Sequence, residues 1–429
     1  MHQEGMPICH WLHKTLNRSL SQSHTVESSM NMRLNSPEPS VASLLENARA
    51  LIPLLKQQGP LHDSQKRISS EIGTALREAG FFKICQSKEN GGYGMRPSTL
   101  WRVAREIGRG DSATAWILSL AGLHPWMAGM FSTRAQDDVF AGGKDAIVIA
   151  LTGNVGRGVS ARQEGDSYVL TGKWTYASGI DIADWAATLV EVPLENGTSE
   201  MRLLLVPQSS FRIDHDSWNV FGMQGTGSKD VYLNEERVPA YRSLLWTDIL
   251  QLKFPGVERN RGPMYRIPHT SLFVMSVAAA ITSVAAGMLD IYIDTIKKRI
   301  PAGLKAPQIE DRFSLAELGK AASHIDMAFN QLMHDVDEMW DQAVAGVPFS
   351  IEQRARYRTN GSTICDTTLT ACDALVRNLG GSLLPTGPIE RYFRDLHSMA
   401  SHFLMQANPS AELLGLALLG LPLPPNARI

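Results

Sequence analysis

The sequence predicts an α+β protein with an N-terminal helical domain at residues 39–145, a central β-barrel or sandwich at 146–240, and a C-terminal domain at 241–429 that contains a four-helix bundle. Apolar residues recur at intervals of three and four before residue 140 and again after Pro239, which is typical of helices with one buried face. Between these segments, short runs such as "IVIALTG" and "MRLLLVPQ" are separated by Gly, Asn, Asp and Pro, which predicts strands joined by turns. A chain of 429 residues is long enough for two or three structural units.

Residues 1–38 differ from the rest of the chain in composition. They are rich in Ser and Asn, lack helical periodicity and contain no continuous apolar segment of the secretory-signal type. We predict that they form a disordered extension. The alternative is that they precede a later start at Met30 or Met32.

The N-terminal domain is predicted to contain four helices. The first begins near Ser40 and is expected to end at Gly59-Pro60, and Asp63 is expected to cap a second helix that ends at Gly80. The segment at 97–131 indicates two further helices that are broken around residues 108–110, with Asp111 or Ser112 as the cap of the second.

Four long helices are predicted in the C-terminal domain, near residues 270–299, 312–345, 350–379 and 386–405. The segment that begins at Ser271 is the most apolar of the chain. It is rich in small residues, contains Ser and Thr, and runs into an acidic residue. These features favour a buried core helix over a membrane span.

Composition excludes several classes of partner and cofactor site. The net charge of -2 gives no electrostatic reason to expect nucleic acid or an anionic membrane as a partner. None of the four cysteines is in a CxxC pair, which predicts free thiols in a reducing, cytoplasmic compartment. No spacing of His, Cys, Asp and Glu predicts a metal site, and no GxGxxG sequence leads from a strand into a helix to bind a pyridine nucleotide.

Four segments, in order along the chain, resemble the acyl-CoA dehydrogenase superfamily: "LREAGFFKICQSKENGGYG", "GKWTYASGIDIADW", "WNVFGMQGTGSKDVYLNEERVP" and "LGGSLLPTGPIERYFRD". The resemblance covers nearly everything from about residue 40 onward. Two features depart from it. Many acyl-CoA dehydrogenases have a carboxylate base just after the Arg-Asp helix, where this chain reads "HSMASHFLMQANPS", with no Glu before Glu412. The usual Gly-Ser-Asp signature is replaced by "NVGRGVSAR".

Both departures resemble the oxygenase components of two-component flavin-dependent monooxygenases, such as those that act on 4-hydroxyphenylacetate, indole or dibenzothiophene. The resemblance implies that reduced FMN or FAD reacts with O2 to form a C4a-hydroperoxyflavin, which oxidises a small aromatic or heteroaromatic substrate. It also implies a separate NAD(P)H-flavin reductase and a homotetramer built through the C-terminal bundle. Two alternatives remain: an FAD-dependent acyl-CoA dehydrogenase or oxidase with a displaced carboxylate, and a non-enzymatic member kept as a scaffold or binder.

The predicted last helix contains two histidines, His397 and His402. At about 100° per residue they lie about 140° apart, so they cannot share a face, and His402 falls near the stripe of Arg391 and Asp395. The resemblance implies that His402, seven residues after Asp395, is the catalytic and substrate-binding base. Imidazole can accept a proton from a phenol or indole at neutral pH. His397 is predicted to be a partly solvated surface residue.

The resemblance assigns roles to further residues. Ser178 is expected to be a catalytic donor near flavin N5. Trp174 and Tyr176 are expected to lie on the same face of the strand as Ser178 and to form the wall around the flavin ring. His124, next to Pro125 at a helix kink or end, is expected to reach the substrate and the reacting oxygen, and Thr152 is a weaker substrate contact. The expected flavin-binding residues are Trp174, Tyr176, Ser178, Gly179, Thr226, Ser228 and Arg299. Purely structural roles stay open as alternatives. His124 could be a packed core histidine, Ser178 a hydroxyl that caps the end of a strand, and Arg299 a cation that compensates the dipole at a helix C-terminus.

Overall fold

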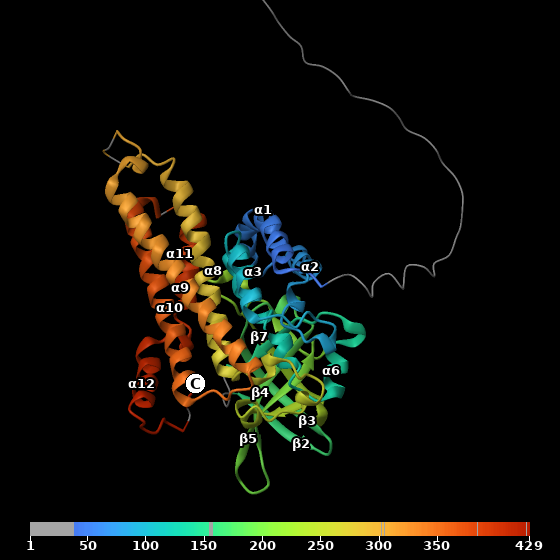
Figure 1. Cartoon of the computed structure of the whole chain (residues 1–429). Helices are drawn as coiled ribbons and strands as arrows, with labels where there is room; N and C mark the ends of the chain where they lie inside the picture. Colours follow the sequence, from blue (N-terminus) through green and yellow to red (C-terminus); the bar gives the residue numbers. More distant parts are fainter. Residues whose placement is uncertain (1–37, 154–157, 302, 304, 384, 426) are drawn as a thin grey trace, which may run out of the picture. The chain divides into compact units, whose positions relative to one another are not determined.

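The structure is a computed structural model that describes residues 38–153, 158–301, 303, 305–383, 385–425 and 427–429. Its N-terminal part contains six α-helices. They are α1 (Val41–Gln65), α2 (Ser70–Glu78), α3 (Pro97–Gly108), α4 (Ser112–Ala121), α5 (His124–Ala128) and α6 (Thr133–Val139) (Figure 1). Short 3-10 turns occur at Phe81–Lys83, Lys88–Asn90 and Ala141–Gly143. The predicted disorder of residues 1–38 falls, apart from Glu38, outside the described residues.

The predicted end of the first helix is wrong. α1 continues through Gly59 and Pro60 to Gln65, and Asp63 lies inside it; Ser69 caps α2 instead, by accepting from the Ile72 N–H. Packing explains the extension, because Gly59 lies against the guanidinium of Arg391, where a Cβ would come within 2.5 Å of Nη2. The break predicted around residues 108–110 is confirmed, because α3 ends at Gly108 and α4 begins at Ser112. Asp111 caps α4 by accepting from the Thr114 N–H at 2.9 Å.

Two four-stranded sheets follow the helices. The first has the order β1 (Val148–Leu151), β4 (Trp185–Pro193), β5 (Ser199–Pro207) and β8 (Ser243–Leu245); the second has the order β2 (Val159–Glu164), β3 (Ser167–Ala177), β7 (Lys229–Pro239) and β6 (Arg212–Asp214). β1 and β4 are parallel, and the other neighbouring pairs are antiparallel. β4 and β5 each contain a continuous run of buried residues, which places apolar residues such as Val190 and Leu203 in the core.

The C-terminal part is helical again: α7 (Trp246–Leu250), α8 (His269–Ile296), α9 (Arg312–Val344), α10 (Ile351–Leu379), α11 (Pro388–Ala400) and α12 (Ala407–Leu418). α8, α9 and α10 lie side by side (Figure 1). The predicted fourth helix at 386–405 is too long, because α11 ends at Ala400, and α12 was not predicted. The chain therefore has the predicted helical, β and helical order.

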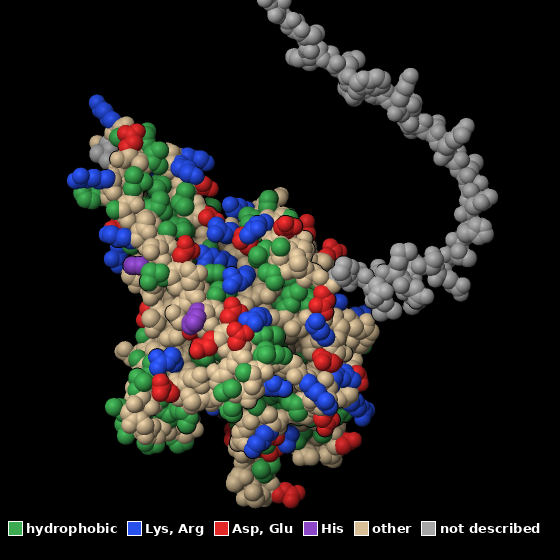
Figure 2. All heavy atoms as spheres, viewed as in Figure 1, with side chains coloured by type: hydrophobic (Ala, Val, Ile, Leu, Met, Phe, Trp, Pro, Cys, Tyr) green, Lys and Arg blue, Asp and Glu red, His purple; other side chains and the backbone are tan. Residues whose placement is uncertain are grey.

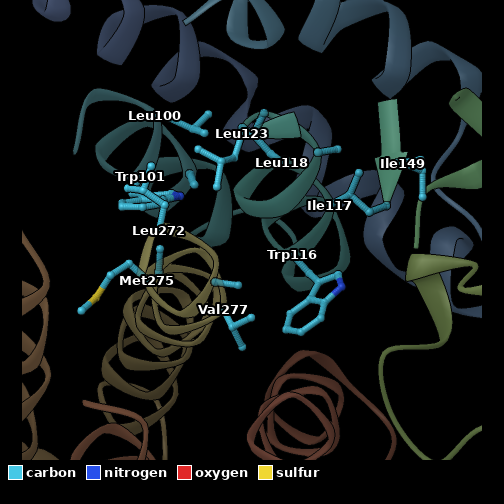
Figure 3. Close-up of a cluster of buried hydrophobic side chains, with 14 of the residues drawn as sticks. Leu100, Trp101, Trp116, Ile117, Leu118, Leu123, Ile149, Leu272, Met275 and Val277 are labelled. Carbon is cyan, nitrogen blue, oxygen red and sulfur yellow. The ribbon is translucent and has the colours of Figure 1, made fainter. Parts of the chain in front are cut away.

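α8 is the central helix of this arrangement. It is long and apolar enough to cross a membrane, but 89% of its most apolar window is buried inside the protein, as predicted for a core helix. It packs against α3, α4, α10 and α11. Figure 3 shows Leu272 and Met275 of α8 with Leu100 and Trp101 of α3 in a shared apolar cluster, while the indole of Trp116 projects from α4 away from that cluster. Cys85, Cys365 and Cys372 are free and buried, as predicted for the described cysteines.

Candidate active site

Two neighbouring cavities lie between the sheets, α4, α8 and the segment after α11. The serine cavity has a volume of about 600 Å³, and its wall includes Trp116, Tyr176, Ser178, Trp218, Ser228 and His402. The aromatic cavity has a volume of about 410 Å³, and its wall includes His124, Trp126, Trp246, His269 and Arg354. Both cavities are lined by Ala150, Thr152, Phe273 and Phe403. A ligand in one cavity therefore borders a ligand in the other.

The serine cavity contains a chain of hydroxyl groups that begins at Ser178. The Oγ atoms of Ser178 and Ser228 are 2.6 Å apart, and Ser228 Oγ is 2.6 Å from Thr226 Oγ1, which donates to the carbonyl of Met223. Because a carbonyl only accepts, each hydroxyl must donate toward it: Ser178 to Ser228, and Ser228 to Thr226. Ser178 can turn its proton into the cavity without leaving Ser228 as an unsatisfied donor.

Trp116 fixes the oxygen of Ser178 from the other side. Its indole N–H donates to Ser178 Oγ at 3.1 Å. Trp116 was not singled out by the sequence analysis, because it lies in an almost uniformly apolar helix that gives no signal for a polar contact. The backbone at Gly179 supports this arrangement: Gly179 has φ +75° and its N–H donates to the carbonyl of Thr226. Thr226 itself is buried, so it acts through Ser228 and is not in the cavity wall.

The expectation that Trp174 and Tyr176 share a face of β3 is wrong. The register of β3 against β7 shifts between Trp174 and Ala177, and Tyr176 has φ +61°. This irregularity breaks the alternation of side chains along the strand. Trp174 is therefore buried in the core, where its indole N–H donates to the carbonyl of Leu189. Tyr176 is 67% exposed and meets Trp218 edge-on at 6.1 Å in the cavity wall.

His402 lines the serine cavity beside Phe273 and Phe403, which line both cavities, but it does not lie on a helix. It follows the end of α11 and caps a 3-10 turn at Phe403–Met405, with the Leu404 N–H donating to its Nδ1 at 3.3 Å. Burial, and secondly the positive charge of Arg358, lower the pKa of His402 to about 4. The ring is therefore neutral near pH 7, and because Nδ1 accepts, its proton is on Nε2. His402 thus presents a donor, which does not match the proton-accepting role expected for it.

His124 presents the complementary arrangement in the aromatic cavity. Its Nδ1 is 2.8 Å from the carbonyl of Val148, so Nδ1 carries the proton and Nε2, which is buried and has no partner, is an acceptor. Burial lowers the pKa of His124 to about 4, against the opposing effect of this hydrogen bond. His124 begins α5, as expected for a histidine at a helix end. The available acceptor is therefore His124 and not His402.

His269 is a second histidine of the aromatic cavity that the sequence analysis missed. It stacks between Trp126 and Phe273, at 5.7 and 6.0 Å between ring centroids, and Trp246 meets it edge-on at 5.2 Å. Burial, and secondly His124, lower the pKa of His269 to about 4. The signal for it in the sequence was its place directly after Pro268, at the start of the most apolar helix.

Arg299 does not reach either cavity within this chain. It lies beyond the C-terminal end of α8, whereas Phe273 lies near the other end, and the helix between Phe273 and Ile296 is roughly 35 Å long. Its guanidinium donates to Ser382 Oγ, Gln308 Oε1 and the carbonyl of Leu379. These contacts give Arg299 a role in holding together the ends of helices, and its contact with a flavin phosphate stays a prediction. His397, in contrast, is partly exposed as predicted, and its Nε2 lies 2.8 Å from Asp373 Oδ1.

Asp395 connects α11 to the wall of the serine cavity, a role that was not predicted. Its buried carboxyl group accepts from the hydroxyl of Ser112 and the N–H of Met223. The neighbouring Arg394 donates to the carbonyl of Phe221 at 2.7 Å. Burial raises the pKa of Asp395 to about 7, against the opposing effect of these hydrogen bonds. Arg394 and Asp395 therefore hold the segment around Gly222 against α11.

No Asp or Glu is among the described residues that line either cavity. Glu412, the first Glu after α11, is exposed on α12. A group of three possible metal ligands, His334, Asp335 and Glu338, lies on α9 away from the cavities. Its carboxylates already accept from Gln331, Asn360 and Tyr357. The described walls of the cavities thus lack the Asp or Glu side chain that removes a proton in a dehydrogenase.

The serine cavity fits a flavin ring by its shape and its donors. Aromatic side chains of Trp116, Tyr176 and Trp218 form its walls, as suits a flat polycyclic ligand. Thr175 belongs to this wall, and its Oγ1 is buried without a hydrogen-bond partner. At Gly222 a Cβ would overlap the carbonyl oxygen of Arg394, so only glycine lets this wall lie so close to α11.

Comparison with known families agrees with this geometry. The model described as "Acyl-CoA dehydrogenase, N-terminal domain" matches residues 55–140, and "Acyl-CoA dehydrogenase, C-terminal domain" matches residues 275–407. The chain belongs to the acyl-CoA dehydrogenase superfamily.

Within this superfamily the chain is similar to flavin-dependent oxygenases. It is 29% identical to the flavin-dependent monooxygenase, oxygenase subunit HsaA of Rhodococcus jostii (88% of this chain, 99% of the relative). It is 27% identical to the FADH(2)-dependent resorcinol hydroxylase, oxygenase component of a Rhizobium species (91% and 98%). The crystal structure of 3-HSA hydroxylase from Rhodococcus sp. RHA1 aligns with a TM-score of 0.83 at 29% identity (89% and 98%).

Proposed function

We propose that this superfamily member is the oxygenase component of a two-component flavin-dependent monooxygenase that oxidises a small aromatic or heteroaromatic substrate. The observation that carries the proposal is the pair of neighbouring cavities, which contain hydroxyl and neutral imidazole groups but no Asp or Glu side chain among their described lining residues. The oxygenase subunits and components to which the chain is similar support it. The alternative of an acyl-CoA dehydrogenase lacks a base.

The serine cavity is the proposed flavin site and the aromatic cavity the proposed substrate site. Reduced flavin, when bound, supplies the electrons with which O2 is activated, so that one oxygen atom enters the substrate and the other leaves as water. Tyr176 and Trp218 would flank the ring, and Ser178, held by Trp116 and Ser228, would donate to it. The apolar walls exclude bulk water, which limits the loss of activated oxygen as H2O2.

The two histidines at the substrate have complementary roles in this proposal. His124 Nε2 accepts the hydrogen bond of a substrate O–H or N–H, which makes the aromatic ring a better nucleophile. His402 Nε2–H donates to an oxygen atom where the cavities meet. Both rings are neutral above about pH 4. Thr152, which borders both cavities, is a further polar contact.

The reduced flavin would come from a separate NAD(P)H-flavin reductase, as the naming of the relatives as oxygenase subunits or components supports. A cytoplasmic homotetramer is part of the proposal. Exposed apolar side chains on the C-terminal bundle support assembly there; Phe313 is 68% and Met327 62% exposed, and hydrophobic side chains are visible on the end of the bundle in Figure 2.

A turnover assay tests the proposal. The purified protein is mixed with photoreduced flavin and air in the presence of a panel of phenols, indoles and thiophenes. We expect a hydroxylated or otherwise oxygenated product without any pyridine nucleotide in the assay. Parallel titrations with FADH2 and FMNH2 identify the cofactor, and the name of the resorcinol hydroxylase supports FADH2 as the first candidate. Tightly bound oxidised FAD that is bleached by an acyl-CoA would instead favour the dehydrogenase. Absence of any flavin binding would favour a scaffold.

A further inference from the structure

The N-terminus of α8 lies at the wall of the aromatic cavity. His269 and Thr270, the first two residues of this 28-residue helix, both line the cavity, as does Phe273 one turn later. Pro268 precedes the helix, and no side chain caps its first turn within the described part of the chain. The first N–H groups of an α-helix have no carbonyl partner in the helix itself. These donors, together with the partial positive charge of the helix end, therefore face the cavity wall.

The side chain of His269 is a second polar feature at the same place. It is only 8% exposed, it belongs to the cavity wall, and neither of its ring nitrogens has a hydrogen-bond partner among the described residues. Trp126 and Phe273 stack against the ring, and Trp246 meets it edge-on. These contacts fix the ring but use none of its polar atoms. A buried polar group without a partner costs free energy, so His269 is placed to bind a ligand.

His269 and His124 offer different hydrogen-bonding groups to such a ligand. Burial, and secondly the neighbouring His124, lower the pKa of His269 to about 4, so its ring is neutral near pH 7 and carries one N–H. Because neither ring nitrogen is engaged, His269 can turn this N–H to a ligand by choice of tautomer. His124 uses its own N–H on the carbonyl of Val148, so its Nε2 only accepts. The wall thus presents one imidazole donor and one imidazole acceptor.

The charged groups that face the cavity from other elements have the same sign as the helix end. Arg354 of α10 and Arg428 both line the cavity, and Arg354 is already engaged by the backbone oxygen of Ile429 at 2.8 Å. No Asp or Glu is among the described lining residues. The arginines act on any anion in the cavity, whereas His269 acts at one place on its wall. An experiment must therefore separate the effect of His269 from that of the arginines.

We propose that His269 and the first-turn N–H groups of α8 form an oxyanion subsite, which binds the hydroxyl oxygen of the substrate and favours its ionised form. The inference rests on the proposed function, because it assigns the ionisation state of the substrate in that site. The O–H of a phenol points to His124 Nε2, and the lone pairs of the same oxygen accept from His269 and α8. On ionisation the O–H bond breaks, the electron pair stays on oxygen and His124 Nε2 takes the proton. An ionised phenol is the better nucleophile at its ring carbons.

The ionisation of a bound coloured phenol tests the proposal without flavin or turnover. 4-Nitrophenol is bound to the flavin-free protein and titrated with pH, because only its ionised form is yellow. We expect its pKa to fall by about one to two units on binding, which corresponds to roughly 10- to 100-fold tighter binding of the ionised form. An unchanged or raised pKa of the bound phenol, or the absence of binding, would overturn the proposal.

His269→Phe is the main variant, because phenylalanine keeps the aromatic stack and removes both ring nitrogens. It should move the pKa of bound 4-nitrophenol back by about one unit toward its value in water. His269→Gln, which keeps an N–H donor, should restore part of the shift, and thermal melts check that both variants fold. The control is His324→Phe, because His324 is exposed on α9 and lines neither cavity. A full shift in His269→Phe would assign the effect to Arg354 and Arg428 and contradict the role of His269.

The subsite and the proposed function can fail separately. A lowered pKa of the bound phenol, without oxygenation of any phenol by reduced flavin and air, would refute the proposed function and leave the subsite standing. Oxygenation of phenols by a protein that leaves the pKa of bound 4-nitrophenol unshifted would refute the subsite and leave the proposed function standing.

Discussion

The hydroxyl groups of Ser178 and Ser228 lie 2.6 Å apart, and the direction of donation between them is set by a carbonyl two links away. Ser178 is thus held by one acceptor, Ser228, and one donor, Trp116. Its position does not depend on a bound ligand. Because the oxygen atom is already held by Trp116, only the O–H proton has to rotate from Ser228 toward a ligand, which costs little conformational freedom.

Replacing Ser178 by Ala should uncouple oxygen activation from product formation. The donor in the proposed flavin site is lost, so we expect the H2O2 released per flavin oxidised to rise severalfold while the fold is unchanged. Ser228→Ala is the matched control. It removes the acceptor of Ser178 but leaves the Ser178 donor free for the ligand, so its effect should be much smaller. An equal effect of both variants would show that the hydroxyl chain acts only as a structural unit.

The two histidines should respond differently to substitution, because His402 is a donor and His124 an acceptor. His402→Gln keeps an N–H donor near the position of Nε2, so we expect it to retain more hydroxylation than His402→Ala, with flavin affinity nearly constant. His124→Ala removes the acceptor and should lower kcat on the order of 10²-fold or more. Steady-state kinetics with purified protein and reduced flavin measures both. Unchanged turnover in His124→Ala would return the acceptor role to another residue.

Acid should destabilise the protein between about pH 6.5 and pH 4 through its buried histidines. The pKa of His124, His269 and His402 is about 4 in the folded protein, below the unfolded value of 6.5. In this window the unfolded chain binds more protons, so stability is complete above pH 6.5 and is lost as the pH falls, by up to about 3 kcal/mol for each histidine.

Urea unfolding at several pH values, with His269→Phe as the variant, measures this effect. The variant keeps the aromatic stack and should reduce the pH dependence. Asp395 has the opposite effect on the pH dependence of stability. Because its pKa of about 7 in the folded protein lies above the ordinary 3.8, its contribution to the free energy of unfolding falls as the pH rises toward 7. Asp395→Asn should therefore steepen the loss of stability toward low pH. A pH dependence that is identical in His269→Phe and the parent would contradict the assigned protonation states.

Gly222→Ala should weaken flavin binding more than it weakens the fold. The added Cβ would overlap the carbonyl of Arg394, so the segment around residue 222 must move away from α11 and widen the serine cavity. We expect at least a 10-fold rise in the Kd of reduced flavin. Gly319→Ala on α9 is the control, because nothing lies within 4 Å of its added Cβ. Its helix should be stabilised by about 0.5–1 kcal/mol, without any change in flavin affinity.

Local sequence patterns predicted many of the helices and several of the candidate site residues. The helical period predicted α3, α8, α9 and α10, and Asp111 was one of the two expected caps of α4, because these features depend on residues within a few positions of one another. The departure at "HSMASHF" separated the chain from dehydrogenases with a carboxylate base, since the loss of an acidic residue is visible in the sequence itself. Ser178, Ser228, His402 and Thr152 were also among the residues singled out, and all four lie in the wall of the serine cavity.

Tertiary packing decided the rest. α1 passes through Gly59-Pro60 because Arg391, more than 300 positions later, needs the space beside Gly59. The bulge that separates Trp174 from Tyr176 exists only in the pairing of β3 with β7. The protonated nitrogen of each histidine is set by a distant carbonyl or a nearby amide, which converts His124 into the acceptor and His402 into the donor. The sequence by itself determined which chemical groups are available, and contacts between distant segments determined which of their atoms face the ligands, because hydrogen bonds and steric fit depend on positions in space.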